Sequence, residues 1–342
     1  MIGARLRICS ARVEAAPLVS VQELLSAGSL GELEALYAAR GFQGDRRAFL
    51  LRAQQDWHRV ALAEAKRLDP PAPLELDAVT VEPLGKRVSV HGVIHGMVGG
   101  DDPAYKQFVD ARLRKLSHTA FENGLSWFYP AARKAVIPDF AVLGVLGSIA
   151  LGLQVGFLFP RLVWETLREL LKLGRGRDGA GGEELVEYSP RYHGLDPELR
   201  RGIEPDPPLP ARLQIEYEMG EWDRRGALAA LRDPFAIVPR SLYMAGFALG
   251  WAEGPGSGAA DLVVGDLHTM EVVRFLEQVE RWEAHPLFAA GRRFARLSPL
   301  RRELTRAALK AVHLAFAALS GAAILIPALL GLLWLLQRYV LP

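Results

Sequence analysis

Cysteine is almost missing from this sequence of 342 residues, in which Cys9 is the only one. A single cysteine excludes an intrachain disulfide framework, a CxxC redox pair and a zinc ribbon. The eight histidines are then left as the soft metal ligands. An excess of one charge is missing too, since 41 basic residues face 39 acidic ones. We therefore expect no nucleic-acid partner, because such proteins show a basic domain or stripe.

Two further kinds of signal are absent. Residues 1–16 carry Arg5, Arg7 and Arg12 but no continuous apolar run, so there is no secretory h-region and the N-terminal part is expected in the cytoplasm. The chain also lacks GxSxG, HExxH, P-loop and GxGxxG motifs, which excludes the chemistries that these motifs mark. Half the residues are hydrophobic and 23% are charged, so a folded core is expected.

Long hydrophobic runs, by contrast, are present. Residues 140–159 form a 20-residue run without charge, and residues 311–336 form a longer one. Both lengths match a bilayer crossing. A basic stretch precedes the second run and only Arg338 follows it, so the positive-inside rule predicts a cytoplasmic start and an external C-terminus. Small residues recur every fourth position in the first run, a face suited to helix packing or homo-oligomer contact: Gly144, Ser148, Gly152 and Gly156.

Outside these runs, the pattern is that of an α/β protein. Helical periodicity covers residues 20–68, with Ser20 and Glu23 at capping-box spacing. Strand-like segments then alternate with a helix at 105–116, which is the βαβ rhythm of a parallel sheet. The predicted fold is a mainly parallel sheet with flanking helices, plus one C-terminal transmembrane helix and a mid-chain hydrophobic segment.

This reading divides the chain into six parts. They are an N-terminal helical region (1–72), the first half of the α/β core (73–134), the hydrophobic segment (135–173), a Gly/Pro-rich linker (174–212), the second half of the core (213–290), and the basic stretch with the C-terminal helix (291–342).

The chemistry concentrates in two segments that share the pattern V-x-G-x-x-H. One ends with Gly92 and His95 and the other with Gly265 and His268, each after a predicted strand and before a helix. Ligands in parallel sheets bind beyond the carboxyl ends of strands, and glycine lets the backbone approach a ligand closely. The two histidines, with a carboxylate, would form a nitrogen and oxygen ligand set for Zn, Mn, Co or Fe.

Two more side chains fit this site. Glu122 ends the strand-like segment 119–122 and is the candidate metal ligand or general base. Arg240 opens a predicted helix and could hold a carboxylate or stabilise an oxyanion. Structural roles remain open for all of them: backbone-bonded strand-end histidines, a cap or ion pair for Glu122, and a surface pair for Arg240.

The order of these motifs resembles the TraB/PrgY family, which is related to the Tiki proteases and more remotely to ChaN-like and erythromycin-esterase-like proteins. The matching pieces are Gly92-Val-Ile-His95, Phe121-Glu122, Arg240-Ser-Leu-Tyr-Met-Ala245 and Leu262-Val-Val-Gly-Asp-Leu-His268. For Tiki-like members the resemblance implies metal-dependent peptide hydrolysis by the paired histidines and the glutamate. For PrgY-like members it implies shutdown of a peptide pheromone signal.

Three positions depart from the family pattern: Ser241 follows the arginine, Asn123 follows the glutamate, and Asp266 stands in the second motif. The expectation is a membrane-anchored hydrolase acting on peptides with Mn, Co or Zn, its catalytic residues Glu122 and Arg240. The alternatives are a non-catalytic peptide-binding or regulatory protein and a membrane protein with a decayed site. We expect it in a prokaryotic cell membrane.

The two V-x-G-x-x-H motifs also limit the possible membrane topology. Both V-x-G-x-x-H motifs must share one compartment to form one site, yet residues 140–159 lie between them. A single crossing there would separate His95 from His268. We therefore expect this run to dip into the membrane or pack against the C-terminal helix. Only residues 311–336 would span fully, leaving the α/β core in the cytoplasm.

Overall fold

The structure is a computed structural model that describes residues 17–67, 78–93, 103–133, 135–139, 149, 153, 195–203, 209–226, 236–254 and 258–339. The hydrophobic run 140–159 therefore lies outside the described residues except for Ile149 and Leu153, and its prediction stays untested. His95 also lies outside them.

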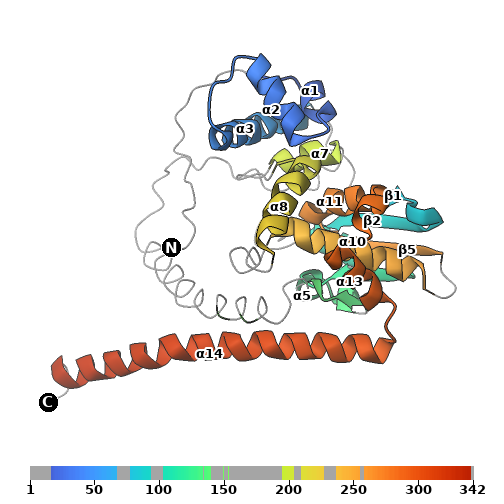
Figure 1. Ribbon diagram of the computed structural model, residues 1–342. Helices are drawn as coiled ribbons and strands as arrows, with labels where there is room; N and C mark the ends of the chain where they lie inside the picture. Colours follow the sequence, from blue (N-terminus) through green and yellow to red (C-terminus); the bar gives the residue numbers. More distant parts are fainter. Residues whose placement is uncertain are drawn as a thin grey trace.

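A five-stranded sheet forms the centre of the fold (Figure 1). Its strands, in spatial order, are β1 (Ala78–Val81), β2 (Arg87–Val93), β5 (Ala259–Gly265), β3 (Thr119–Glu122) and β4 (Val136–Ile137). Strand β1 runs antiparallel to β2 after the short turn η1 (Pro83–Gly85), and every other pairing is parallel. The predicted α/β class with a mainly parallel sheet is confirmed. The late strand β5 lies between β2 and β3, so the two halves of the core share one sheet.

Helices cover both faces of this sheet. Residues such as Val90 and Leu262 join the larger core, while Phe121 and Val263 join a second core on the other face. This division follows from the alternation of side chains along a strand. The first face carries α10 (Ile237–Ala252) and α11 (Asp266–Glu277), and the second carries α4 (Pro103–Leu113), α5 (Leu125–Phe128) and η2 (Pro130–Arg133).

Helix α13 (Pro286–Ala295) packs against α10 at very close range. A methyl group at Gly246 would overlap the carbonyl of Phe288, and one at Gly291 would overlap the carbonyl of Tyr243. Glycine is therefore required at both positions for the two backbones to meet. The short helix α12 (Val279–Trp282) connects α11 to α13, whereas the sequence predicted one unbroken helix over 271–282.

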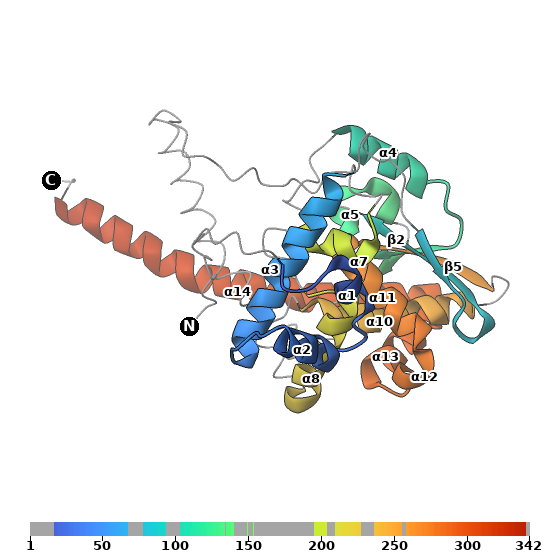
Figure 2. The ribbon, with the colours of Figure 1, turned by 90° about the horizontal axis from the view of Figure 1, so that it is seen from above.

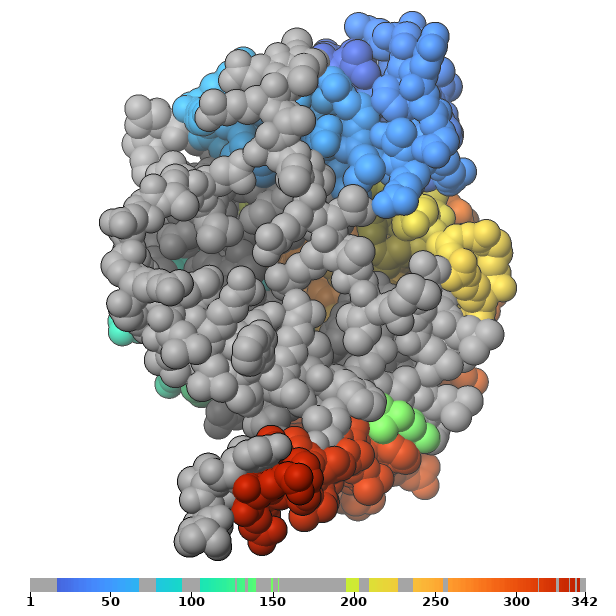
Figure 3. Space-filling view, turned by 90° about the vertical axis from the view of Figure 1, so that its left-hand side faces the viewer, coloured from blue at the N-terminus to red at the C-terminus, as the bar shows by residue number. Residues whose placement is uncertain are grey.

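The N-terminal helices form a separate layer with a core of their own. They are α1 (Val21–Ser26), α2 (Leu30–Ala39) and α3 (Arg46–Ala65). Ser20 caps α1 in the predicted capping box with Glu23. In Figures 1 and 3 this blue layer lies at the opposite end of the molecule from the red C-terminal helix.

Two helical stretches come before α10 in the chain. The end of the predicted linker is folded, as α7 (Pro197–Arg200) and η5 (Arg201–Ile203), because Asp196 caps the first turn and both arginines are buried against α11. Helix α8 (Ala211–Arg225) follows. It ends at Gly226, whose φ of 52° suits glycine.

Helix α14 (Pro299–Tyr339) is a continuous, largely exposed apolar helix. Leu300 is 70% exposed and Leu314 is 59% exposed. It begins at Pro299, so Arg301, Arg302, Arg306 and Lys310 of the basic stretch belong to the same helix, whereas Arg292 and Arg293 lie in α13. In the part of the chain that the structure describes, it is the one helix long and apolar enough to cross a membrane, over Pro299–Leu335. Figures 1 and 2 show its C-terminal end projecting beyond the core.

Candidate functional site

The parallel strands bring their carboxyl ends to one edge of the sheet. In register, Val93 of β2 lies opposite Gly265 of β5, and Glu122 of β3 lies opposite Ile137 of β4. Glu122 is therefore at the edge, and Asp139 follows β4 at the same edge. This is the place where doubly wound folds build their ligand sites.

Arg240 joins the two carboxylates. It lies in the first turn of α10, and its Nη2 donates to Glu122 Oε1 at 2.9 Å while its Nε donates to Asp139 Oδ2 at 2.7 Å. All three side chains are buried. The sequence correctly paired Glu122 with Arg240 at one site but missed Asp139. The expected alternative of a surface pair is wrong for Arg240, since it is 8% exposed.

Glu122 also fixes the start of α11. Its Oε2 accepts a hydrogen bond from the backbone N–H of Gly265 at 2.6 Å. Gly265 is the N-cap residue of α11, so the carboxylate lies at the positive end of the helix dipole. A cofactor-binding role for Gly265 was predicted, and the observed role of this glycine is to bind Glu122.

His268 reaches the same cluster from a helix rather than a strand end. Strand β5 stops at Gly265 and α11 begins at Asp266, so the predicted position of His268 at a strand end was wrong. Its Nδ1 lies 2.8 Å from Ser241 Oγ, and its Nε2 lies 3.8 Å from Glu122 Oε1.

Ser241 determines the tautomer of this imidazole. Its hydroxyl donates its one hydrogen to the carbonyl of Ile237 at 2.9 Å, so it accepts from Nδ1–H of His268. A neutral His268 then carries its lone pair on Nε2, on the side of Glu122. Serine at this position was noted as a departure from the TraB/PrgY pattern, and it has a definite role in orienting the ring.

Burial and charge shift two pKa values here. Burial raises the pKa of Asp139, with Glu122 adding to the rise and Arg240 opposing it. Burial alone would lower the pKa of Arg240, but Asp139 and Glu122 raise it above the ordinary value. The cluster thus sets two carboxyl groups against one permanent cation in a buried place. Asp139 Oδ1 has no hydrogen-bond partner among the described residues.

Gly92 lies beside this cluster for a packing reason. A methyl group there would come within 2.5 Å of Asp266 Oδ1 and 2.7 Å of Thr269 Oγ1. The glycine lets the first turn of α11 lie close against β2. Its predicted role in binding a cofactor is not tested, but its contact with α11 is clear.

The structure describes only part of the metal-ligand set that the sequence predicts. His268 and Glu122 are close together, while His95, the third predicted ligand, lies outside the described residues. Within the described ranges no group of three His, Cys, Asp or Glu side chains could hold a metal ion. His91 is buried, and its Nε2 lies 2.9 Å from Asp261 Oδ1.

A second buried cluster braces the same helix. Arg200 pairs with Asp266 Oδ1 at 3.0 Å, and Arg201 pairs with Glu271 and donates to the carbonyl of Leu267 at 2.9 Å. Burial raises the pKa of Glu271 to about 7, and Arg201 opposes that rise. The sequence gave no signal for this cluster, because its arginines come from the predicted linker.

Comparison with protein-family models, with curated proteins and with solved structures gave no significant match.

Proposed function

We propose that this chain is a membrane-anchored, TraB/PrgY-like hydrolase that acts on peptides with the help of a divalent metal ion. One observation carries the proposal: Glu122, Arg240 and His268, far apart in the sequence, meet in a buried cluster at the carboxyl edge of the sheet. Buried polar groups that converge at such an edge are typical of binding and catalytic sites.

The donor set supports a metal ion of the Mn, Co or Zn class. Among the described residues, the carboxyl groups of Glu122 and Asp139 and the imidazole of His268 meet around Arg240 in this buried cluster. Imidazole and carboxylate are ligands that these metals accept. His268 and Glu122 would hold the ion, together with His95 by the sequence pattern. When bound, the ion would polarise the peptide carbonyl and acidify a water molecule.

Residues of the chain itself have the remaining catalytic and positioning roles. Glu122 is the general base that takes a proton from water. Arg240 donates a hydrogen bond to Glu122 Oε1 at 2.9 Å, and the Gly265 N–H donates to its other oxygen at 2.6 Å. Ser241 orients the His268 ring through Nδ1, as an outer partner commonly does for a metal-binding histidine.

A non-catalytic alternative is favoured by one feature of the same cluster. Both oxygens of Glu122 already accept hydrogen bonds from Arg240 and Gly265, which is also how a purely structural buried carboxylate would be held. On this alternative the protein binds or regulates a peptide without cleaving it. A measurement of peptide cleavage distinguishes the hydrolase from the binding protein.

The test is peptide cleavage by detergent-purified full chain supplied with Mn, Co or Zn. Glu122→Gln keeps the shape of the side chain and removes the base, so cleavage should fall at least about 100-fold. Glu277→Gln, an exposed change at the other end of α11, is the matched control and should cleave normally. An unchanged rate in Glu122→Gln removes Glu122 from the mechanism. Cleavage of no peptide in a broad library favours the binding protein.

Membrane anchoring is proposed through α14. Its exposed leucines suit lipid, and its start is fixed to the core where Arg302 stacks 4.4 Å above the Trp251 ring. The protein should stay with membranes after alkaline carbonate extraction. Single cysteines at Ser89 and Ser257, in a Cys9→Ser background, should both escape an impermeant thiol reagent on intact cells. Labelling at Ser89 alone would mean that residues 140–159 cross once.

A further inference from the structure

A hollow of about 460 Å³ lies where β1 and α11 end. Val81 and the turn η1 form one wall, and the end of α11 with the start of α12 forms the other. Val81 pairs with Val88, near the start of β2, so the hollow is at the amino edge of the sheet. The 12 residues of α11 place it about 18 Å from the carboxyl edge. Its ligand is therefore independent of the proposed hydrolase site.

The floor of the hollow is apolar. Leu276 and Val279 are buried beneath it, and Leu84 stands at its side with 51% of its surface exposed. Leu84 has a φ of 52°, in the left-handed region where glycine is usual and a bulky residue is rare. A large apolar side chain thus remains at the surface, in a backbone conformation that does not suit it. The floor and Leu84 offer contact to an aliphatic group.

The rim of the hollow is acidic. Among the described residues that line it, Glu82, Glu277 and Glu280 are acidic and none is basic. Glu277 pairs with Arg274 at 2.8 Å. Glu82 and Glu280 are exposed and have no ion pair within the described ranges. The basic residues that follow η1 in the chain do not line the hollow. The lining therefore favours a cation.

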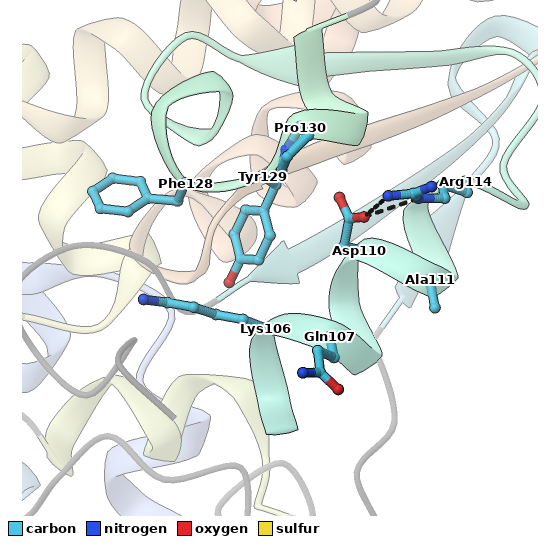
Figure 4. A pocket seen from close by; sticks show the side chains of 8 residues that line it. All are labelled: Lys106, Gln107, Asp110, Ala111, Arg114, Phe128, Tyr129 and Pro130. Atoms are coloured by element: carbon cyan, nitrogen blue, oxygen red, sulfur yellow. Dashed lines mark hydrogen bonds and ion pairs between the residues drawn. The ribbon is translucent and has the colours of Figure 1, made fainter. Parts of the chain in front are cut away.

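A hollow on the opposite face of the sheet has a different lining. It lies between α4 and the segment after β3, and groups of both signs surround it (Figure 4). Asp110 and Arg114 form an ion pair there. Such a lining does not favour a ligand of one charge, whereas the hollow beside η1 does.

The strand that leads into the acidic hollow is an edge strand. Among the described strands, β1 pairs only with β2, and Figure 1 shows it at one edge of the sheet. Edge strands present unpaired backbone N–H and C=O groups on their outer side. Ala78 and Thr80 of β1 are exposed. Extended peptides add to such edges, and neighbouring pockets select their side chains. A segment added to β1 would reach the hollow at Val81.

We propose that the outer edge of β1 and this hollow form a docking site for an extended protein segment that carries an arginine or lysine next to an aliphatic residue. The cation pairs with Glu82 and Glu280, and the aliphatic side chain packs on Leu84 and the apolar floor. The backbone of the segment pairs with β1. Charge selects the cation, and the edge strand selects a peptide over a small molecule.

Blocked hexapeptides test this site by isothermal titration calorimetry on the full chain in detergent. An Arg-Leu pair is moved along a Thr-Val background, and each peptide is matched by one with citrulline, which keeps the shape of arginine without its charge. The best arginine peptide should bind about tenfold more tightly than its citrulline match, the size expected for two exposed ion pairs. Agmatine, a small guanidinium compound, should bind more weakly than the peptide.

Backbone methylation tests the pairing with β1. Alternate N–H groups of a strand point towards its neighbour, so N-methylation of one alternate set in the best peptide should abolish binding. Methylation of the other set should leave binding intact. Equal binding of both methylated forms, or of agmatine and the peptide, overturns docking of an extended segment.

Substitutions in the hollow complete the test. Glu82→Gln plus Glu280→Gln should weaken the arginine peptide about tenfold and leave the citrulline peptide unchanged. Glu283→Gln plus Glu303→Gln removes the same charge from exposed positions outside the hollow and should change neither. If both double variants bind the arginine peptide equally, the proposal is wrong.

Leu84→Gly separates binding from folding. Glycine suits the left-handed backbone at this position, so thermal stability should be unchanged or higher. The lost apolar contact should weaken the peptide about fivefold. Unchanged peptide affinity in Leu84→Gly would remove Leu84 from the docking site and contradict the proposal.

Discussion

Two buried arginine clusters contact helix α11, and they differ in the groups that they join. In the bracing cluster, Arg200 and Arg201 pair with Asp266 and Glu271. In the edge cluster, Arg240 pairs with Glu122 and Asp139, and the His268 imidazole lies beside them. Guanidinium and carboxylate pairs are typical of a buried structural support, whereas imidazole is the commonest metal ligand in proteins.

The clusters also differ in what they hold. The bracing cluster connects α11 to the N-terminal layer, since η5 packs on α3 and His58 Nδ1 lies 2.8 Å from the carbonyl of Gly202. The edge cluster instead connects strand ends to the first turns of two helices. We therefore expect changes in the bracing cluster to act on stability and changes in the edge cluster to act on chemistry.

The largest effect should follow from removing Arg201. Arg201→Met leaves Glu271 buried without its cation, and breaking a buried pair in this way costs about 3–5 kcal/mol of unfolding free energy. The measurement is denaturant unfolding of the full chain in detergent at pH 8. Arg224→Met, exposed at the end of α8, serves as the control and should stay within about 0.5 kcal/mol. If Arg201→Met lowers the unfolding free energy no more than Arg224→Met does, the Arg201–Glu271 pair does not stabilise the fold.

A smaller effect is expected where the two clusters meet. Gly92→Ala places a methyl group against Asp266 and Thr269, and overpacking of this kind costs about 1–3 kcal/mol. Because the displaced turn carries His268, metal binding should weaken as well. Gly220→Ala, in open space on α8, should be neutral or slightly stabilising. If both variants are equally stable, β2 and α11 are not in close contact.

A further effect is a pH dependence that comes from the bracing cluster. The folded protein raises the pKa of Glu271 to about 7 from 4.5, so the fold favours its protonated form. That contribution to stability is present below about pH 4.5 and is lost as the pH rises towards 7. Glu271→Gln cannot titrate. The stability of wild type minus that of Glu271→Gln should therefore fall across this window, and a constant difference would contradict the raised pKa.

The sequence predicted some of this arrangement residue by residue. The strand ending at Glu122 and the helix carrying Arg240 were both found, because the two polar residues stand out against apolar neighbours. The position of β5 between β2 and β3 was not predictable, since strand order depends on tertiary packing. Asp139 was missed because a strand of two residues gives no pattern.

The bracing cluster could not be predicted from the sequence either. Residues 195–203 look like linker because they are rich in charge, proline and glycine, and nothing local indicates that Arg200 and Arg201 are buried. Their partners lie on α11, far away in the sequence. The helix α11 begins directly at Asp266, with no loop after β5, so His268 was assigned to a strand end.

Elemental analysis of detergent-purified protein tests the edge cluster most directly. Wild type is compared with the double variant His95→Ala plus His268→Ala, and with His285→Ala, which changes a helix cap far from the cluster. The account predicts one divalent metal ion per chain in wild type and in His285→Ala, and loss of that metal in the double variant. Loss of a residue that only orients a metal ligand lowers metal affinity about 10- to 100-fold, and loss of the ligands themselves should lower it at least as much. Equal metal content in wild type and the double variant would contradict it.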